Sequence, residues 1–154
     1  MFLLGKISAS ELFFYIISQF AAALISAFLS YLTGGDLNVL KPSVNVSYLH
    51  AVVFELLFTF LLLFTILMLC VSGLNQGNHY FGFAIGLAVF AGISVAGPVS
   101  GGSMNPAVAT AMILSDLLNG GNTLKYIWIY SAGPVTGGLL ALYVYRFLHK
   151  YQNT

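Results

Sequence analysis

The chain has 154 residues, of which 59% are hydrophobic and only 6% are charged, and its formal net charge is +1. Soluble domains carry about 25% charged residues, so this composition excludes a soluble protein and indicates an all-α integral membrane protein. No basic run is present that could bind nucleic acid. The single cysteine and the scattered histidines offer no disulfide and no metal-binding spacing, so no cofactor is expected.

Four apolar segments reach or approach the length of about 20 residues that crosses the hydrocarbon core of a membrane. They are 12–32, 51–71, 81–99 and 126–148. The helical pattern at 105–118 is too short to cross and predicts a re-entrant half-helix, ended by Asp116 and the glycine-rich turn at 119–122. Four spans place both termini on one side, and three basic residues against two favour the cytoplasm for that side.

Small residues recur at four-residue spacing in two of these spans, as Gly82 with Gly86 and as Gly133 with Gly137. In lipid, such faces let two helices approach closely. We therefore expect both pairs to lie at helix contacts.

The triplet Asn105, Pro106 and Ala107 marks a helix start inside this lipid-like sequence. Asn105 can cap the helix, and Pro106 occupies the first helical position, where its missing N–H costs nothing. Because the stretch before it is rich in glycine, the backbone is irregular at membrane depth. Irregular backbone is tolerated there only if it is buried in protein or lines a wet cavity, so the triplet predicts a pore or a binding site.

Asn105 can serve two purposes that are compatible with each other. Its side-chain oxygen can cap the half-helix while its NH2 group donates hydrogen bonds into a pore. The positive end of the helix dipole, about half a charge, lies beside it. That field disfavours cations and protons, whereas a neutral polar molecule can still accept a hydrogen bond.

Glu55 is the only acidic residue inside a long apolar run. A carboxylate there is costly, so it should face protein or water and find a donor. It could relay protons or bind a cation, or it could accept hydrogen bonds from free backbone N–H groups where the chain enters the half-helix. Thr59, one turn later on the same face, could extend such a network. We favour the supporting role because a re-entrant loop supplies many unpaired donors.

The loop 100–110 resembles the second Asn-Pro-Ala loop of the aquaporin (major intrinsic protein) family. Glu55 and Thr59 resemble its Glu-xxx-Thr pattern, and 132–138 resembles its sixth-helix Gly-Pro-xx-Gly-Gly pattern. The resemblance implies a partial, right-handed aquaporin-like bundle of four spans and one half-helix.

By this resemblance, residues 12–32 are the third helix of the family and 51–148 its complete second repeat. The first two helices and the first half-helix are then absent from residues 1–154. Family pores join two half-helices, one from each inverted repeat, whereas this sequence has a single triplet.

The resemblance assigns the selectivity filter to Ile93, Gly102 and Val108. Val108 follows the triplet where family members usually have arginine, and the combination resembles the tonoplast-intrinsic subgroup. It implies a wider, less polar constriction, with fewer donors to exclude cations. Ala109 stands where glycerol-specific members place aspartate, which argues against that subgroup.

The implied function is a passive transmembrane channel for water and small neutral solutes, represented by an incomplete chain. The alternative is a non-conducting truncated subunit that associates with full-length channel subunits. A pair of oppositely inserted copies and half of a secondary transporter are further alternatives, and no enzyme is expected. Partners are the lipid bilayer and either further copies, as tetramers by resemblance, or full-length relatives. Plasma membrane and vacuolar or other intracellular membranes remain open as locations.

Overall fold

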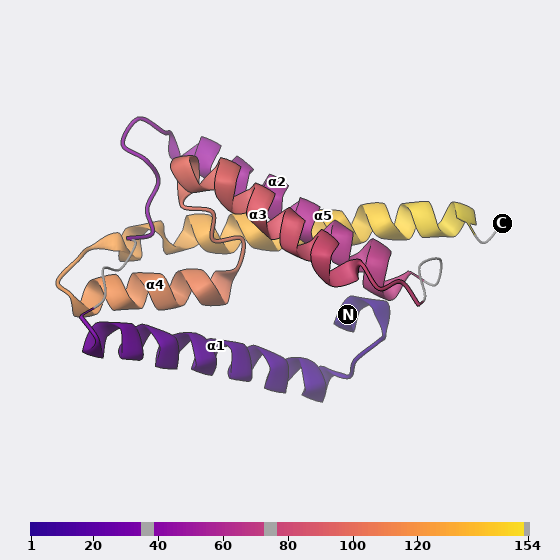
Figure 1. The fold of residues 1–154 in the computed structure, drawn as a ribbon, viewed down its shortest axis with the longest axis horizontal. Helices are drawn as coiled ribbons and strands as arrows, with labels where there is room; N and C mark the ends of the chain where they lie inside the picture. Colours follow the sequence, from indigo (N-terminus) through magenta and orange to yellow (C-terminus); the bar gives the residue numbers. More distant parts are fainter. Residues whose placement is uncertain (35–38, 73–76, 153–154) are drawn as a thin grey trace. The chain divides into compact units, whose positions relative to one another are not determined.

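The computed structural model describes residues 1–34, 39–72 and 77–152, and it contains no strand among them. The five α-helices are α1 (Ala9–Leu32), α2 (Tyr48–Ile66), α3 (Phe81–Ser100), α4 (Pro106–Leu118) and α5 (Ile127–Gln152), shown in Figure 1. Short helical turns are η1 (Phe2–Leu4), η2 (Leu67–Val71), which is π-helical and continues α2, and η4 (Thr123–Tyr126). The predicted all-α architecture is confirmed.

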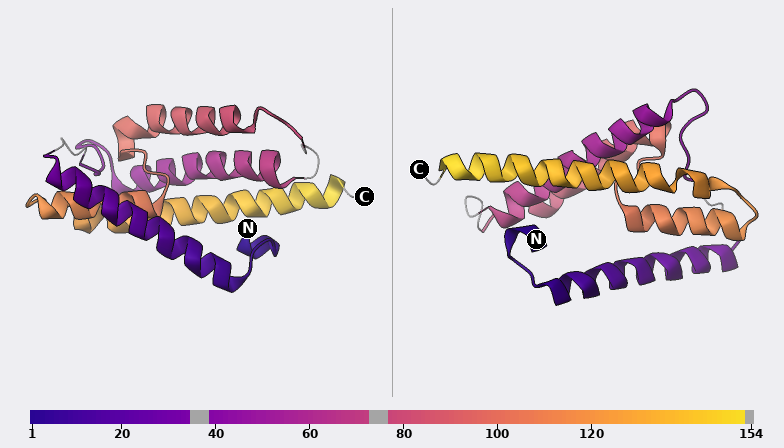
Figure 2. Two further views of the ribbon diagram at one scale, coloured as in Figure 1. Left: turned by 60° about the horizontal axis from the view of Figure 1, so that its bottom comes forward. Right: turned by 180° about the vertical axis from the view of Figure 1, so that it is seen from behind.

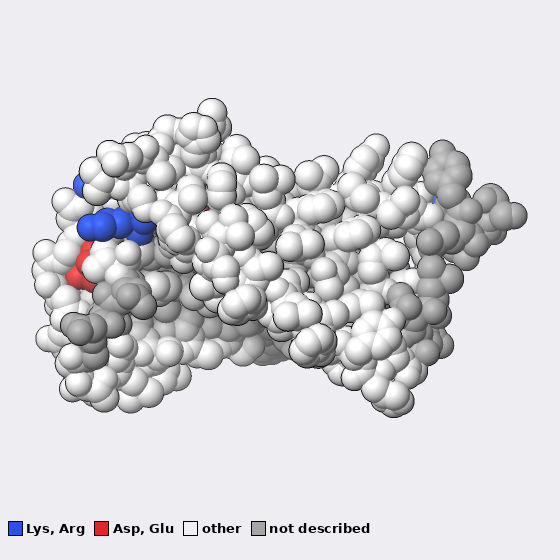
Figure 3. Space-filling view, turned by 45° about the horizontal axis from the view of Figure 1, so that its top comes forward, with Lys and Arg blue, Asp and Glu red and all other residues white. Residues whose placement is uncertain are grey.

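Among the described residues, four helices are long and apolar enough to cross a membrane, as the sequence predicted. They are Ala9–Leu32, Tyr48–Val71, Phe81–Ser100 and Thr123–Lys150. The 13 residues of α4 extend only about 20 Å at 1.5 Å per residue, less than the roughly 30 Å of the hydrocarbon core. In Figure 3 the visible charged side chains gather at the left end of the view, and most of the other described side chains are uncharged.

The chain divides into two compact units. The first comprises residues 1–39 and 107–125, and the second comprises 40–106 and 126–154.

In the first unit, α1 begins at a complete capping box. The Ser8 hydroxyl accepts the backbone N–H of Glu11 at 3.2 Å, and the Glu11 carboxylate accepts the backbone N–H of Ser8 at 2.7 Å. These bonds satisfy donors that a helix start leaves free. Further along, the hydroxyl of Ser115 on α4 donates to the carbonyl of Ala27 on α1 at 3.3 Å, so the two helices are in contact.

The end of α4 is organised by Asp116, as the sequence suggested. Its Oδ2 atom accepts the backbone N–H of Thr123 at 3.0 Å and the hydroxyl of Thr123 at 2.7 Å. The backbone N–H of Gly121 also donates to the Asp116 carbonyl at 2.8 Å. The glycine-rich turn is therefore closed onto the last turn of the helix.

In the second unit, α2 packs against both α3 and α5, and the views in Figure 2 agree on this arrangement. Gly133 and Gly137 make the close approach possible. A Cβ atom at Gly137 would lie 2.3 Å from the Leu56 carbonyl oxygen, and one at Gly133 would lie 2.7 Å from the Glu55 Cβ. This part of the packing prediction is confirmed.

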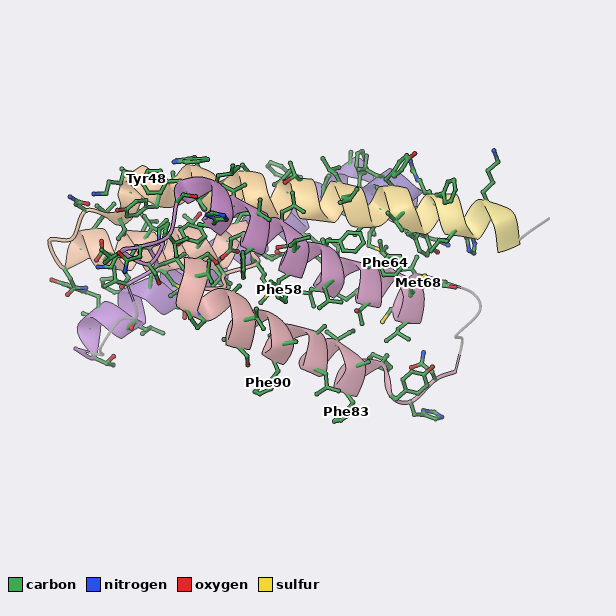
Figure 4. The ribbon with its side chains drawn as sticks, turned by 90° about the horizontal axis from the view of Figure 1, so that it is seen from above. Tyr48, Phe58, Phe64, Met68, Phe83 and Phe90 are labelled. Carbon is green, nitrogen blue, oxygen red and sulfur yellow. The ribbon has the colours of Figure 1, made fainter. Side chains whose placement is uncertain are left out.

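The other glycine pair makes no such contact. In the part of the chain that the structure describes, no atom lies within 4 Å of a Cβ position at Gly82 or Gly86. Figure 4 shows Phe83 and Phe90 pointing away from α2, and they are 74% and 69% exposed. The close approach predicted at Gly82 and Gly86 is therefore not made by any of the described residues.

The directions of the helices in the second unit show that the segment between α3 and α5 is re-entrant. Ser100 at the end of α3 contacts Glu55 near the start of α2, so these two helices are antiparallel. The ring of Tyr126, just before α5, lies 5.7 Å from the ring of Tyr48 at the start of α2. The chain thus leaves and returns at the same end of the helix group, as the half-helix prediction requires.

Candidate functional site

The loop that joins α3 to α4 begins with two residues in the left-handed region of backbone conformation. Gly101 has φ of 101° and Gly102 has φ of 66°, values that L-residues with side chains rarely adopt. The N–H of Gly101 still bonds to the last turn of α3, at 3.0 Å from the Gly97 carbonyl. These glycines end the helix and turn the chain sharply toward the triplet.

Glu55 lies beneath this loop and is fully buried. Its Oε1 atom accepts the hydroxyl of Ser100 at 2.7 Å and the backbone N–H of Ser103 at 3.0 Å. Its Oε2 atom accepts the backbone N–H of Met104 at 2.7 Å. Three donors thus converge on one carboxylate, and charge-assisted bonds of this kind are the stronger ones.

Two serines take the remaining donors of the loop. The Ser100 hydroxyl accepts the N–H of Gly102 at 3.2 Å, and the Ser103 hydroxyl accepts the N–H of Asn105 at 3.4 Å. Every backbone N–H from Gly101 to Asn105 therefore has an acceptor inside the protein.

The carbonyl groups of the loop, unlike its N–H groups, are mostly without a hydrogen-bond partner among the described residues. The Tyr130 hydroxyl on α5 donates to the Ser100 carbonyl. Within the described ranges, the next three carbonyls, of Gly101, Gly102 and Ser103, accept no hydrogen bond from the protein. The loop thus pairs its donors inside the protein, whereas these three carbonyl acceptors are left without a protein donor.

Thr59 does not extend the Glu55 network. Its side chain is only 3% exposed, and its Oγ1 atom has no hydrogen-bond partner in the part of the chain that is described. The expectation that Thr59 would extend the network is therefore wrong. The donors of the loop gather one turn earlier on α2, at the Glu55 carboxylate.

Two of the three predicted filter residues lie side by side. A Cβ atom at Gly102 would be 3.4 Å from the Cα atom of Ile93 and 3.2 Å from the backbone nitrogen of Gly97. Position 102 therefore faces the backbone of α3 and has no room for an unshifted side chain. Val108 belongs to α4 in the other unit, so its place beside them stays a prediction.

The triplet lies where the sequence predicted it. Asn105 directly precedes α4, Pro106 is its first residue and Ala107 its second. Ser100 was not predicted to have a role, although its hydroxyl links Gly102 to Glu55. A serine at the end of an apolar helix carries no signal of such a contact, because its partner lies 45 residues away.

Comparison with known proteins supplies the family. The family model described as Major intrinsic protein matches residues 1–145. The chain belongs to the major intrinsic protein family. With its four apolar spans, this member of the family is a multi-pass integral membrane protein.

Several relatives are named aquaporins. Aquaporin AqpM of Methanothermobacter marburgensis is 33% identical over 151 residues, which cover 93% of this chain and 61% of that protein. Aquaporin TIP4-1 of Arabidopsis thaliana is 37% identical over 145 residues, covering 92% of this chain and 56% of that protein. Aquaporin-4 of Mus musculus is 35% identical over 150 residues, covering 93% of this chain and 44% of that protein. The chain thus spans about half the length of these relatives.

Proposed function

We propose that this chain forms part of a passive membrane channel for water and small neutral solutes. One observation carries the proposal. The loop before the Asn-Pro-Ala triplet directs its N–H donors to Glu55, Ser100 and Ser103, while the three carbonyls from Gly101 to Ser103 have no donor among the residues that the structure describes. A row of fixed acceptors at membrane depth can replace the hydrogen bonds that a water molecule or amide loses on leaving bulk water. The aquaporin names of the relatives support the same function.

The triplet supplies the complementary donor and the charge selectivity in this proposal. Asn105 directly precedes the positive end of α4, where the helix dipole repels cations. Ile93, Gly102 and Val108 carry no charge and no side-chain donor, so the constriction that they form in our proposal selects by size. Urea, glycerol, hydrogen peroxide and ammonia are then candidate solutes besides water, and a relative from the tonoplast-intrinsic group supports this reading.

Within this function, we infer that Glu55 supports the loop and does not relay protons. The inference rests on its contacts, because the hydroxyl of Ser100 and the N–H groups of Ser103 and Met104 occupy both of its oxygens. The side chain is also fully buried, so neither oxygen is open to a proton donor in a pore.

The test is solute flux through the full chain reconstituted alone into lipid vesicles. Osmotic shrinkage measures water permeability, and swelling in isosmotic urea measures solute entry. Asn105→Asp places a negative charge at the helix start and should abolish water flux. Asn122→Asp is the matched control, since it makes the same change at an exposed residue and should conduct like the unchanged chain. Flux that survives Asn105→Asp would contradict the proposed pore.

A second candidate is a non-conducting subunit that associates with a longer channel chain. The single Asn-Pro-Ala triplet of this sequence favours it. The family resemblance implies a pore in which two half-helices meet, and this sequence has the triplet for one. It predicts normal insertion without flux when the chain is alone, and co-purification with a co-expressed full-length aquaporin. Cross-linking in the same membranes would also test the expected tetramer.

A further inference from the structure

The connector between α1 and α2 is attached to the loop of the candidate pore. Leu40 is only 1% exposed, although it lies in a polar stretch. A Cβ atom at Gly101 would lie 2.5 Å from its Cδ1 atom and 3.8 Å from the Tyr130 hydroxyl. The Leu40 side chain therefore fills the space that a side chain at position 101 would need.

Ser43 attaches the same connector to the end of α3. Its backbone N–H donates to the Val99 carbonyl at 3.0 Å, and its hydroxyl donates to the Pro98 carbonyl. The last carbonyls of a helix have no partner within the helix. Ser43 satisfies two of them at the point where the chain turns into the loop.

Three segments thus hold the loop between α3 and α4, namely α2, α5 and the connector. Glu55 on α2 holds the N–H groups of Ser103 and Met104, and Tyr130 on α5 holds the Ser100 carbonyl. Gly102, which lies against Ile93 on α3, gives its own N–H to the hydroxyl of Ser100. The turn before Gly102 is held by the connector.

We propose that Leu40 and Ser43 are positioning residues that set the width of the constriction at Gly102. Leu40 packs against Gly101 and so keeps the next residue, Gly102, against α3. Ser43 fixes the end of α3, from which the loop continues. The proposal rests on the channel function proposed above. Because a pore selects among neutral solutes largely by its diameter, a change at either residue should alter the ratio of urea to water permeability.

The test compares Leu40→Ala and Ser43→Ala in reconstituted full chain, with permeabilities normalised to the inserted protein. Each variant should shift the urea-to-water ratio by about threefold or more, and Leu40→Met and Ser43→Thr should restore it by keeping the volume and the hydroxyl. Val44→Ala is the matched control, because Val44 lies in the same connector and is 95% exposed. An unchanged ratio in Leu40→Ala, with normal insertion, would overturn the proposal.

A second readout separates this proposal from the channel function itself. Hydrogen exchange of the amides of Gly102, Ser103 and Met104 reports how firmly the loop is held, whether or not solute passes. If the unchanged chain carries no flux, the channel proposal fails. Faster exchange in Leu40→Ala than in Val44→Ala would still support the positioning role, and equal exchange would overturn it.

Discussion

The carboxylate of Glu55 accepts the backbone N–H of Met104 at 2.7 Å, across 49 residues of sequence. Met104 has φ of 48°, a left-handed conformation that is costly for a residue with a side chain. The bond offsets part of this cost because it gives a buried backbone N–H an acceptor inside the protein. The relationship explains why an acidic residue is tolerated in an otherwise apolar span.

We expect Glu55→Gln to destabilise the protein. A glutamine has one acceptor oxygen in place of two, and its NH2 group would meet an N–H donor of the loop. The loss should be about 1–3 kcal/mol, the cost of leaving a buried donor unsatisfied, measured by thermal unfolding in detergent. Glu11→Gln is the matched control, since glutamine also fits that position of a capping box. Equal effects of the two changes would argue against loop support by Glu55.

Gly137→Ala and Gly86→Ala should have opposite effects. At Gly137 the added Cβ would lie 2.3 Å from the Leu56 carbonyl oxygen, so α2 and α5 must separate, at a cost of about 1–3 kcal/mol. At Gly86 no atom of another described segment lies within 4 Å of the added Cβ, and alanine should stabilise the helix by about 0.5–1 kcal/mol. Thermal unfolding of both variants checks the prediction, which a comparable loss in both would refute.

Gly102→Ala should displace the loop. Residue 102 has φ of 66° and its added Cβ would lie 3.2 Å from the Gly97 nitrogen. The left-handed conformation alone costs roughly 1–2 kcal/mol with a side chain. We expect urea flux in vesicles to fall about threefold or more, because the constriction changes shape. Gly82→Ala, with open space around its Cβ, should leave flux unchanged.

Asp116→Ala should loosen the turn after α4. The change removes the acceptor of the N–H and hydroxyl of Thr123, a loss of about 1–3 kcal/mol for buried donors. Limited proteolysis should then cut within 119–122 faster than in the unchanged chain. Asn122→Ala, at an exposed residue of the same turn, serves as the control. Identical cleavage in the two variants would show that Asp116 does not close the turn.

The sequence predicted the local features of this protein well. The spans, the half-helix at 105–118 and the isolated acidic residue Glu55 in an apolar run all follow from properties of short segments. It predicted the glycine contacts only in part, since Gly133 and Gly137 pack against α2 whereas Gly82 and Gly86 have no neighbouring helix among the residues described. Both pairs have the same spacing, so the pattern alone could not distinguish a covered face from an open one.

The same limit applies within the candidate site. Thr59 shares a helix face with Glu55, yet only Glu55 receives the loop donors. Leu40 and Ser43 lie in a connector without any motif, and their contacts with Gly101, Pro98 and Val99 depend on the path of the chain.

Membrane class, span number and the helix start at Pro106 were readable from the sequence, because the transfer of a segment into lipid and the capping of a helix depend on neighbouring residues. The donors that Glu55 holds and the contact of Gly102 with Ile93 were decided by the tertiary structure. Contacts such as those of Glu55 join residues 48 and 49 positions apart, and no local preference encodes which distant atoms will meet in the space between packed helices.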